Sequence, residues 1–386
     1  MKKIAYLLFS LAFLMSCADE PKKVEVTVQN PSSFDRLVDI VELSTSDIKT
    51  KLAASDTSSL IVTNATGEVI PSQITSDGKL IFQAGVKSGE SAVYTVRTGP
   101  KQEYKAKTYG RFITERKDDF AWENDRVAFR VYGPALIATD GPSNGIDLWF
   151  KRTPDMIIDK WYKNDLAGTA SYHDDHGEGL DDYKVGRTLG GGAMAPYAEN
   201  KLWLNENFAS QEVIDNGPLR TTFKLTYKDI DVNGKAFSES RTFSIDAGSQ
   251  LTKVTQAYGT TEDMPVAAGI VKRESGDSII VASDKTYVLY MEPKSNKVEG
   301  IYGALVFPQG FDEMVVDSYK ISNEKTKKDD SYSHVLAVAT YKANTPITYY
   351  TGYGWNKYGF ADEKAFEEYL QNFVKATKEP LGITIK

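Results

Sequence analysis

The sequence predicts an all-β protein: a small N-terminal β-sandwich followed by a large two-sheet sandwich, with an amphipathic helix near the C-terminus. Short runs of β-branched and aromatic residues alternate with polar residues along most of the 386 residues, as half-buried strands require. Turn signals separate these runs, and neither a strand–helix–strand rhythm nor a fixed-period repeat occurs. These features favour stacked sheets over an α/β fold.

Residues 1–16 have the pattern of a secretory signal peptide, with a basic start before an apolar run over 4–14. The following "LMSC" resembles a bacterial lipobox, in which the cysteine is lipidated. Cys17 is the only cysteine of the chain, so it cannot form an intrachain disulfide. We therefore expect a Gram-negative cell-envelope protein, anchored at the outer membrane through lipid on Cys17 and by nothing else.

Residues 17–100 are predicted to form the small sandwich, a support domain without catalytic residues. The run "VEVTVQN" alternates valines with polar residues, and Asp77-Gly78 between two such runs is a hairpin turn signal. The strand pattern stops at Gly99-Pro100, which sets the predicted boundary.

Residues 101–386 are predicted to form the larger, catalytic domain, because runs such as "DRVAFRVYG" and "IDLWFKR" continue the strand pattern. Near its end, "ADEKAFEEYLQNFVKATKEP" has apolar residues at helical spacing, with Asp362 as the N-cap and Pro380 beyond the end. The apolar stripe consists of Phe366, Tyr369, Leu370, Phe373 and Val374.

The chain is acidic, with a formal net charge of −7. Removal of residues 1–16 takes Lys2 and Lys3 away and leaves 44 basic against 53 acidic residues. No long basic run occurs, which argues against nucleic acid as a partner.

The stretch "YHDDHGEGLDDYKVGRTLGGG", residues 172–192, holds the strongest candidate site. His173 and His176 lie among five acidic residues, and the neighbouring glycines favour a loop. Histidine titrates near neutral pH, so this composition suits acid–base catalysis, with His173, His176 and Tyr183 as the proton-transfer groups.

Other roles for the same loop stay open. Asp175, Glu178 and a histidine could hold a divalent metal, although the His-x-x-His spacing is loose on a loop. Lys184 and Arg187 are candidates for neutralising an acidic ligand. A solvated acidic loop without a functional role is the third interpretation.

Further candidates lie outside this loop. Arg116, within "ITERKDDFAWENDRVAFRVYG", is a candidate for binding a sugar carboxylate, with surface ion pairs as the alternative. Trp161 and Trp355 lie in aromatic clusters with polar neighbours, and we expect them to stack on sugar rings.

Several blocks of the sequence resemble an envelope lipoprotein family labelled domain of unknown function 4861. They are "FITERKDDFAWENDRVAFRVYGPAL", "GIDLWFKRT", "YHDDHGEGLDDYKVGRTLGGG", "NGPLRTTFKLTY" and "GWNKYGF" with the C-terminal helix. The resemblance covers the chain from about Val24 to its end. It implies a galactose-mutarotase-like supersandwich for the larger domain and a place among polysaccharide-degrading enzymes.

The family includes an ulvan oligosaccharide dehydratase, so the resemblance implies a hydro-lyase. Such an enzyme removes water from the non-reducing-end uronic acid of an acidic oligosaccharide and leaves a 4,5-unsaturated sugar. The reaction needs a cation at the carboxylate, a base at C5 and an acid at O4. Arg116, Lys184 and Arg187 could supply the cation, and the two histidines and Tyr183 the base and acid; no cofactor other than a divalent metal is expected.

Two other functions suit the same residues. An endo-acting polysaccharide lyase would use the same β-elimination to cut the chain, and a glycan-binding lipoprotein would use the aromatic platforms alone. The combination of His, Tyr and Arg in one loop favours the enzymes.

Overall fold

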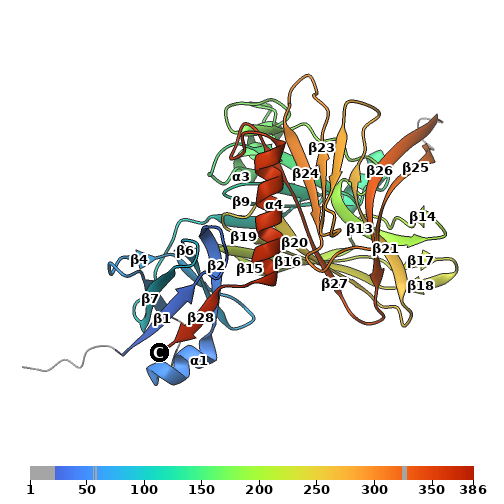
Figure 1. The fold of residues 1–386 in the computed structure, drawn as a ribbon. Coiled ribbons are helices and arrows are strands. Elements are labelled where there is room, and N and C mark those ends of the chain that lie inside the picture. The colour runs from blue at the N-terminus through green and yellow to red at the C-terminus, as the bar shows by residue number, and fades with distance from the viewer. Residues whose placement is uncertain (1–21, 55, 57–58, 324–327) are drawn as a thin grey trace, which may run out of the picture.

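The computed structural model describes residues 22–54, 56, 59–323 and 328–386. Strands make up about half of this part of the chain and helices far less, and the predicted fold class, an all-β sandwich with a C-terminal helix, is confirmed (Figure 1). The signal peptide and Cys17 lie outside the described residues. Within the described ranges, no helix has the length and apolar character needed to span a membrane.

The N-terminal part is a sandwich of two antiparallel sheets around its own core. The first sheet has the order β28 (Gly382–Ile385), β1 (Lys23–Gln29), β7 (Ser91–Thr98), β3 (Leu60–Thr63), β4 (Val69–Ile70). The second has the order β2 (Arg36–Ser44), β6 (Lys79–Val86), β5 (Ser72–Ile74). Helix α1 (Thr45–Leu52) contributes Ile48 and Leu52 to the same core.

The last strand of the chain lies in this N-terminal sandwich. β28 pairs antiparallel with β1, with Ile385 opposite Val26. The division at residue 100 stays a prediction, and the pairing adds that residues 382–385 belong to the sheet of β1.

The larger part has three main sheets rather than two. The sheet that carries the candidate site, called the site sheet, has the order β12 (Gly179–Asp181), β11 (Ile146–Lys151), β10 (Ala128–Val131), β9 (Asp119–Asn124), β8 (Thr108–Ile113). A second five-stranded sheet has the order β14 (Lys201–Leu202), β13 (Gly191–Ala198), β21 (Met264–Val271), β26 (Lys328–Tyr341), β25 (Glu313–Asn323).

The third sheet has eight strands, in the order β15 (Ser210–Asn216), β16 (Arg220–Thr226), β19 (Glu239–Asp246), β20 (Leu251–Tyr258), β27 (Ile347–Trp355), β24 (Ile301–Val306), β23 (Tyr287–Met291), β22 (Ser278–Val281). β17 (Ile230–Val232) and β18 (Lys235–Phe237) form a separate hairpin. All three main sheets contribute to one large core, because strand alternation turns one apolar face of each toward it.

Helix α4 (Glu363–Lys378) forms where the apolar spacing predicted it. Asp362 is the N-cap and accepts a hydrogen bond from the amide of Ala365. Phe366, Leu370 and Val374 are buried against β23 and β24 on the outer face of the eight-stranded sheet. The stripe is core packing.

Helix α3 (Ile158–Leu166) and the loop after it cover the outer face of the site sheet, where we did not predict a helix. The helix is short and has no side-chain N-cap. Its amides at Ile157 and Ile158 instead bind the buried carboxylate of Glu123 on β9. The short segments η1 (Pro134–Leu136) and α2 (Ile137–Asp140) follow β10.

Candidate functional site

Strand alternation places six charged side chains on the outer face of the site sheet. The residues between them, such as Phe129, Leu148 and Phe150, point into the main core. The outer face lies beneath α3 and the loop over residues 171–178, so its charges are buried. They are Asp119, Glu123, Arg130, Asp147, Lys151 and Asp181, each at most 3% exposed. Buried charges on this scale must be paired or functional.

Arg130 on β10 lies between two carboxylates from neighbouring strands. Its Nη2 donates to Asp147 Oδ2 at 2.6 Å and to Asp181 Oδ2 at 2.7 Å, and its Nε donates to Asp147 Oδ2 at 2.9 Å. Register sets this geometry, because Arg130 pairs with Asp147 across β10 and β11. Two acids therefore share one guanidinium.

Aromatic rings enclose the Arg130 guanidinium. Its central carbon lies 4.8 Å from the ring centroid of Tyr132, 5.0 Å from that of Trp149 and 5.6 Å from that of Tyr172. The hydroxyls of Tyr132 and Tyr172 accept from its Nη2 and Nη1 at 3.3 and 3.4 Å. Rings at these distances stabilise the cation and exclude water from it.

The surroundings of Asp147 disfavour the charged form of its carboxyl. Burial, together with the nearby Asp181 carboxylate, raises the pKa of Asp147 to about 7, although Arg130 opposes the shift. Its Oδ1 is buried and has no hydrogen-bond partner among the described residues. A carboxyl that titrates near neutral pH inside a group of charges is a feature of functional sites.

The ring of Tyr172 joins this buried group to the surface. The imidazole of His173 lies 4.6 Å from that ring, and the guanidinium of Arg116 lies 5.6 Å from it. Arg116 is one-quarter exposed and donates to Asp119 Oδ2 at 2.9 Å. His173 and Arg116, predicted from distant segments, thus both lie against the ring of Tyr172.

The contacts of His173 fix its tautomer. Its Nδ1 lies 2.9 Å from the carbonyl oxygen of Asp181, which can only accept a hydrogen bond. The proton of the neutral ring therefore lies on Nδ1, and Nε2 keeps its lone pair. The side chain is 53% exposed, so this nitrogen can meet a ligand as a base.

We call this group the Arg130 site. It consists of Arg116, Asp119, Arg130, Tyr132, Asp147, Trp149, Tyr172, His173 and Asp181.

The acidic residues of the 171–178 loop hold its backbone in place. The carboxylate of Asp175 accepts from the amides of Gly177 and Gly179 and pairs with Arg152 at 3.0 Å. Gly179 has φ +113°, and a Cβ there would lie 1.9 Å from the carbonyl oxygen of Phe150. From another segment, Lys297 donates to the carbonyl oxygen of His173 at 2.7 Å.

The residues predicted as metal ligands have other partners. Asp175 pairs with Arg152, and Glu178 pairs with Lys160 at 2.8 Å. Over the described ranges, no three His, Cys, Asp or Glu side chains are grouped as a metal site would need. A metal requirement stays a prediction.

Three further predicted residues lie outside the Arg130 site. The Nε2 of exposed His176 lies 3.1 Å from the carbonyl oxygen of Ser171. Lys184 is exposed, and its carbonyl oxygen accepts from Arg273. Arg187 donates to the carbonyl oxygens of Leu204 and Asn205. None of these contacts directs the side chain toward His173.

Burial argues against the roles predicted for Tyr183, Trp161 and Trp355. Tyr183 packs against Phe150 on the core face of the site sheet, and burial raises its pKa well above the usual value. Trp355 is 1% exposed, and its indole donates to the carbonyl oxygen of Glu299. Trp161 is 6% exposed and stacks on Trp149, so it supports the site from beneath rather than offering a face to a sugar.

The sequence interpretation missed Arg130, Tyr132 and Asp147. Charged residues at alternate positions of a strand ordinarily indicate a solvated face. A signal was nevertheless present in "IDLWFKR", because Trp149 shares its strand face with Asp147 and Lys151. A tryptophan on the same strand face as two charged residues indicates that this face is covered by other parts of the chain.

A second ion pair lies on the same face. Lys151 Nζ donates to Glu123 Oε2 at 2.7 Å and to the carbonyl oxygen of Asn124 at 2.6 Å. Both side chains are fully buried. Because Glu123 also binds the first amides of α3, this pair attaches the helix to the sheet.

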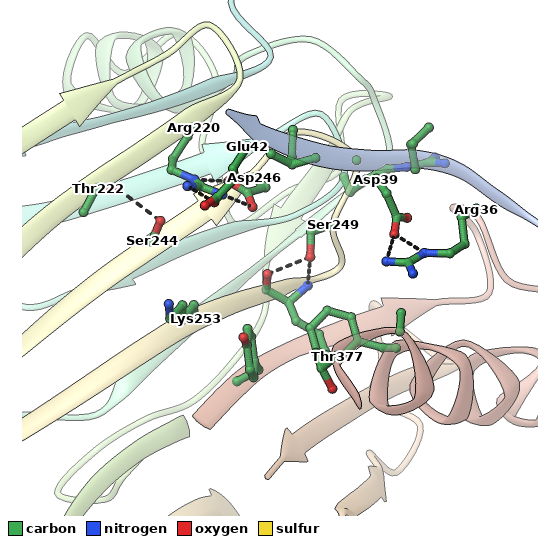
Figure 2. A pocket seen from close by; sticks show the side chains of 18 of the residues that line it. Arg36, Asp39, Glu42, Arg220, Thr222, Ser244, Asp246, Ser249, Lys253 and Thr377 are labelled. Carbon is green, nitrogen blue, oxygen red and sulfur yellow. Dashed lines mark hydrogen bonds and ion pairs between the residues drawn. The ribbon is translucent and has the colours of Figure 1, made fainter. Parts of the chain in front are cut away.

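A groove of about 930 Å³ lies elsewhere, between the N-terminal sandwich, the eight-stranded sheet and α4 (Figure 2). None of its lining residues belongs to the Arg130 site. The Arg130 site is the better candidate for chemistry. It combines the Asp147 carboxyl, whose pKa is raised, with the exposed His173 imidazole and the enclosed Arg130 guanidinium.

The chain is similar to several known proteins. It is 29% identical to an uncharacterized protein of Formosa agariphila, over 99% of this chain and 98% of that one. A solved protein in the glycosyl hydrolase family 38 from Enterococcus faecalis is 9% identical, with a TM-score of 0.48 over 95% of this chain. A heparinase III structure is 11% identical, with a TM-score of 0.34 over 68% of this chain.

The chain spans about half (48%) of the length of the glycosyl hydrolase structure and 38% of the heparinase III structure. Both likenesses are too distant to assign an activity. The family model described as "Domain of unknown function (DUF4861)" matches residues 28–383, which is most of the chain. The protein therefore belongs to the DUF4861 family.

Proposed function

We propose that the protein is a carbohydrate-active hydro-lyase that removes water from the non-reducing-end uronic acid of ulvan-type oligosaccharides. The observation that supports this is the opening of the Arg130 site. There, one cation (Arg116), one exposed imidazole (His173) and one phenol (Tyr132) lie around the same buried charge group. These are the three kinds of group that the elimination needs.

In this proposal His173 Nε2 takes the C5 proton of the uronate. The electron pair of the C5–H bond moves toward the carboxylate, whose growing charge Arg116 stabilises. The C4–O bond then breaks as the new double bond forms between C4 and C5. Tyr132 gives its proton to the departing hydroxyl, which leaves as water, and regains a proton as His173 loses one to solvent.

The surroundings of Tyr132 suit an acid. Burial raises the pKa of Tyr132 well above its usual value, so the phenol is protonated before the reaction and gives up its proton only to an oxygen made strongly basic by breaking of the C4–O bond. Its hydroxyl lies 3.3 Å from Asp147 Oδ2 and from Arg130 Nη2, which hold it in place. Tyr132 therefore takes the role that the sequence gave to Tyr183.

The test is the mass of the product. Incubation with ulvan oligosaccharides should lower their mass by one water without shortening them, and should create the ultraviolet absorbance of an unsaturated uronate. Shorter fragments would make the protein an endo-acting lyase. Binding without any change of mass would make it a glycan-binding protein.

Variants test the assigned roles. His173→Ala and Tyr132→Phe should each lower the rate by about 10²–10⁴-fold, because each removes a positioned base or acid. Tyr183→Phe is the matched control and should keep the rate within about twofold. Near-native rates for the first two variants, with unchanged melting temperatures, would contradict the assignment.

We also propose that the protein works in the cell envelope beside other polysaccharide-degrading enzymes, attached through lipid on Cys17. Cys17→Ala should release it from the membrane fraction of the native host. A variant that still fractionates wholly with membranes would exclude this anchor.

A further inference from the structure

The groove in Figure 2 has a floor and two walls from distant parts of the chain. Its floor is the outer face of β16, β19 and β20, one wall is β2, and the other is α4. Its volume of about 930 Å³ is at the upper end of the roughly 300–1,000 Å³ typical of ligand sites. It lies beside α4, which packs on β23 and β24 and leaves β16, β19 and β20 to form the floor.

Strand register places one polar row across this floor. Thr222 lies opposite Ser244, Ser244 opposite Lys253, and Lys253 opposite Tyr350. The hydroxyls of Thr222 and Ser244 are 3.0 Å apart. Short side chains keep the floor low and offer donors and acceptors along a line. Tyr350 ends the row and meets Phe373 of α4 edge-on at 4.9 Å.

Many of the charges around the row are held in ion pairs. Arg220 binds Asp246 at 2.5 Å and Glu42 at 2.6 Å, and Arg36 binds Asp39 at 2.5 Å. Lys253 is exposed on the floor and has no acidic partner among the described residues. Arg126 also lines the groove without an ion pair among the described residues, and Asp35 and Asp215 accept only from serines, but Lys253 alone of these lies in the polar row.

Apolar side chains line the same groove. Leu37 and Val38 on β2 are 62% and 50% exposed, and Ile214 on β15 is 37% exposed. These apolar side chains lie beside the polar row of the floor. A ligand that complements the groove therefore has both polar and apolar faces. Sugar rings have this character, with hydroxyls at their edges and C–H groups on their faces.

We propose that this groove is a second glycan-binding site, which holds an extended oligosaccharide with an anionic substituent at Lys253. The class of ligand rests on the proposed function, whereas the groove and its unpaired lysine do not. Such a site would keep a long acidic chain on the enzyme while the Arg130 site acts on a chain end.

The test counts binding sites on the full chain carrying His173→Ala, which should turn the substrate over about 10²–10⁴-fold more slowly than the parent. Calorimetry with an ulvan oligosaccharide fraction should show two sites per chain. Ser244→Trp fills the floor and should remove one of them. Lys253→Ala should weaken one site about tenfold, the loss expected for a single charge contact of about 1.4 kcal/mol.

Lys224→Ala is the matched control. Lys224 is on the same face of β16, opposite Thr242, but does not line the groove. It should bind as the parent does. Desulfated ulvan in the same titration distinguishes a sulfate at Lys253, whose removal weakens the site, from a carboxylate, whose affinity is unchanged.

Unchanged binding by both Ser244→Trp and Lys253→Ala, with native melting temperatures, would overturn this second site. So would an absence of binding to the parent chain. Failure of the proposed dehydration is a separate result. In that case the groove still binds the oligosaccharide, and only the assay for unsaturated product is negative.

Discussion

Two ion groups share the outer face of the site sheet, and they differ in how their charges balance. The Glu123–Lys151 pair has one acid for one base, and the carboxylate, the ammonium and the helix amides all have partners. The Arg130 site has two acids on one guanidinium, an unpartnered oxygen on Asp147 and an opening at His173. Trp149 lies between the two groups along β11.

The comparison separates structural from chemical use of buried charge. A buried pair of one acid and one base, with all its polar atoms hydrogen-bonded, can hold a helix in place. It has no free group that could exchange a proton with a ligand. An unbalanced group is costly unless a ligand or proton completes it. The balance of charge and the access to solvent, rather than burial alone, therefore identify the site.

The largest expected effect comes from unbalancing the closed pair. Glu123→Gln should lower the free energy of unfolding by about 3–5 kcal/mol, because it leaves the Lys151 ammonium buried without a counter-charge. Denaturant unfolding measures this loss. The double variant Glu123→Leu with Lys151→Met should regain much of it. A loss below about 1 kcal/mol for Glu123→Gln would mean that the pair does not hold α3.

Asp147→Asn tests the unbalanced group through pH. The folded carboxyl titrates at about 7 and the unfolded one near 3.8, so between these values only the folded state holds the proton. The contribution of this group to the free energy of unfolding is therefore greatest below about pH 4. It decreases as the pH rises toward 7, by up to roughly 4 kcal/mol. The asparagine variant should lack this loss. Parallel stability curves of variant and parent from pH 4 to 8 would contradict the prediction.

Arg116 tests the opening of the site. Arg116→Ala should raise KM about tenfold or more, because the proposed carboxylate contact is lost, and Arg116→Lys should recover only part of it, since lysine cannot bind a carboxylate with two parallel hydrogen bonds. Melting temperatures control for the lost contact with Asp119. An unchanged KM in the alanine variant would place the carboxylate elsewhere.

His176 gives the smallest effect. The residue is exposed and contacts only a backbone carbonyl, so His176→Ala should change the free energy of unfolding by less than about 0.5 kcal/mol. The rate should stay within about twofold. A loss comparable to that of His173→Ala would show that both histidines act on the substrate.

The sequence predicted the fold better than the site. Alternation and helical spacing are local, so the strands and α4 followed directly from the order of residues. The site combines a loop that composition identified, with His173, and strands whose burial depends on α3. The helix was missed because its N-terminus is capped by Glu123, more than thirty residues earlier in the chain.

The position of Tyr183, which differs from the one that its place in the sequence suggested, has a related cause. Closeness in the chain suggested that Tyr183 would act beside His173. The strand β12 ends at Asp181, however, and the chain then takes Tyr183 to the core face of the sheet. Tyr132, which lies far away in sequence, occupies the position beside Asp147 instead.

The pairing of β28 with β1 also has a consequence for the order of synthesis. β28 is the edge strand of its sheet and covers the edge of β1. Until residues 382–385 have been made, the outer edge of β1 lacks this partner, and an uncovered strand edge invites pairing with other chains. Completion of the first sheet therefore needs a strand that follows β1 by more than 350 residues, so a variant that lacks residues 382–385 should aggregate more readily than the parent.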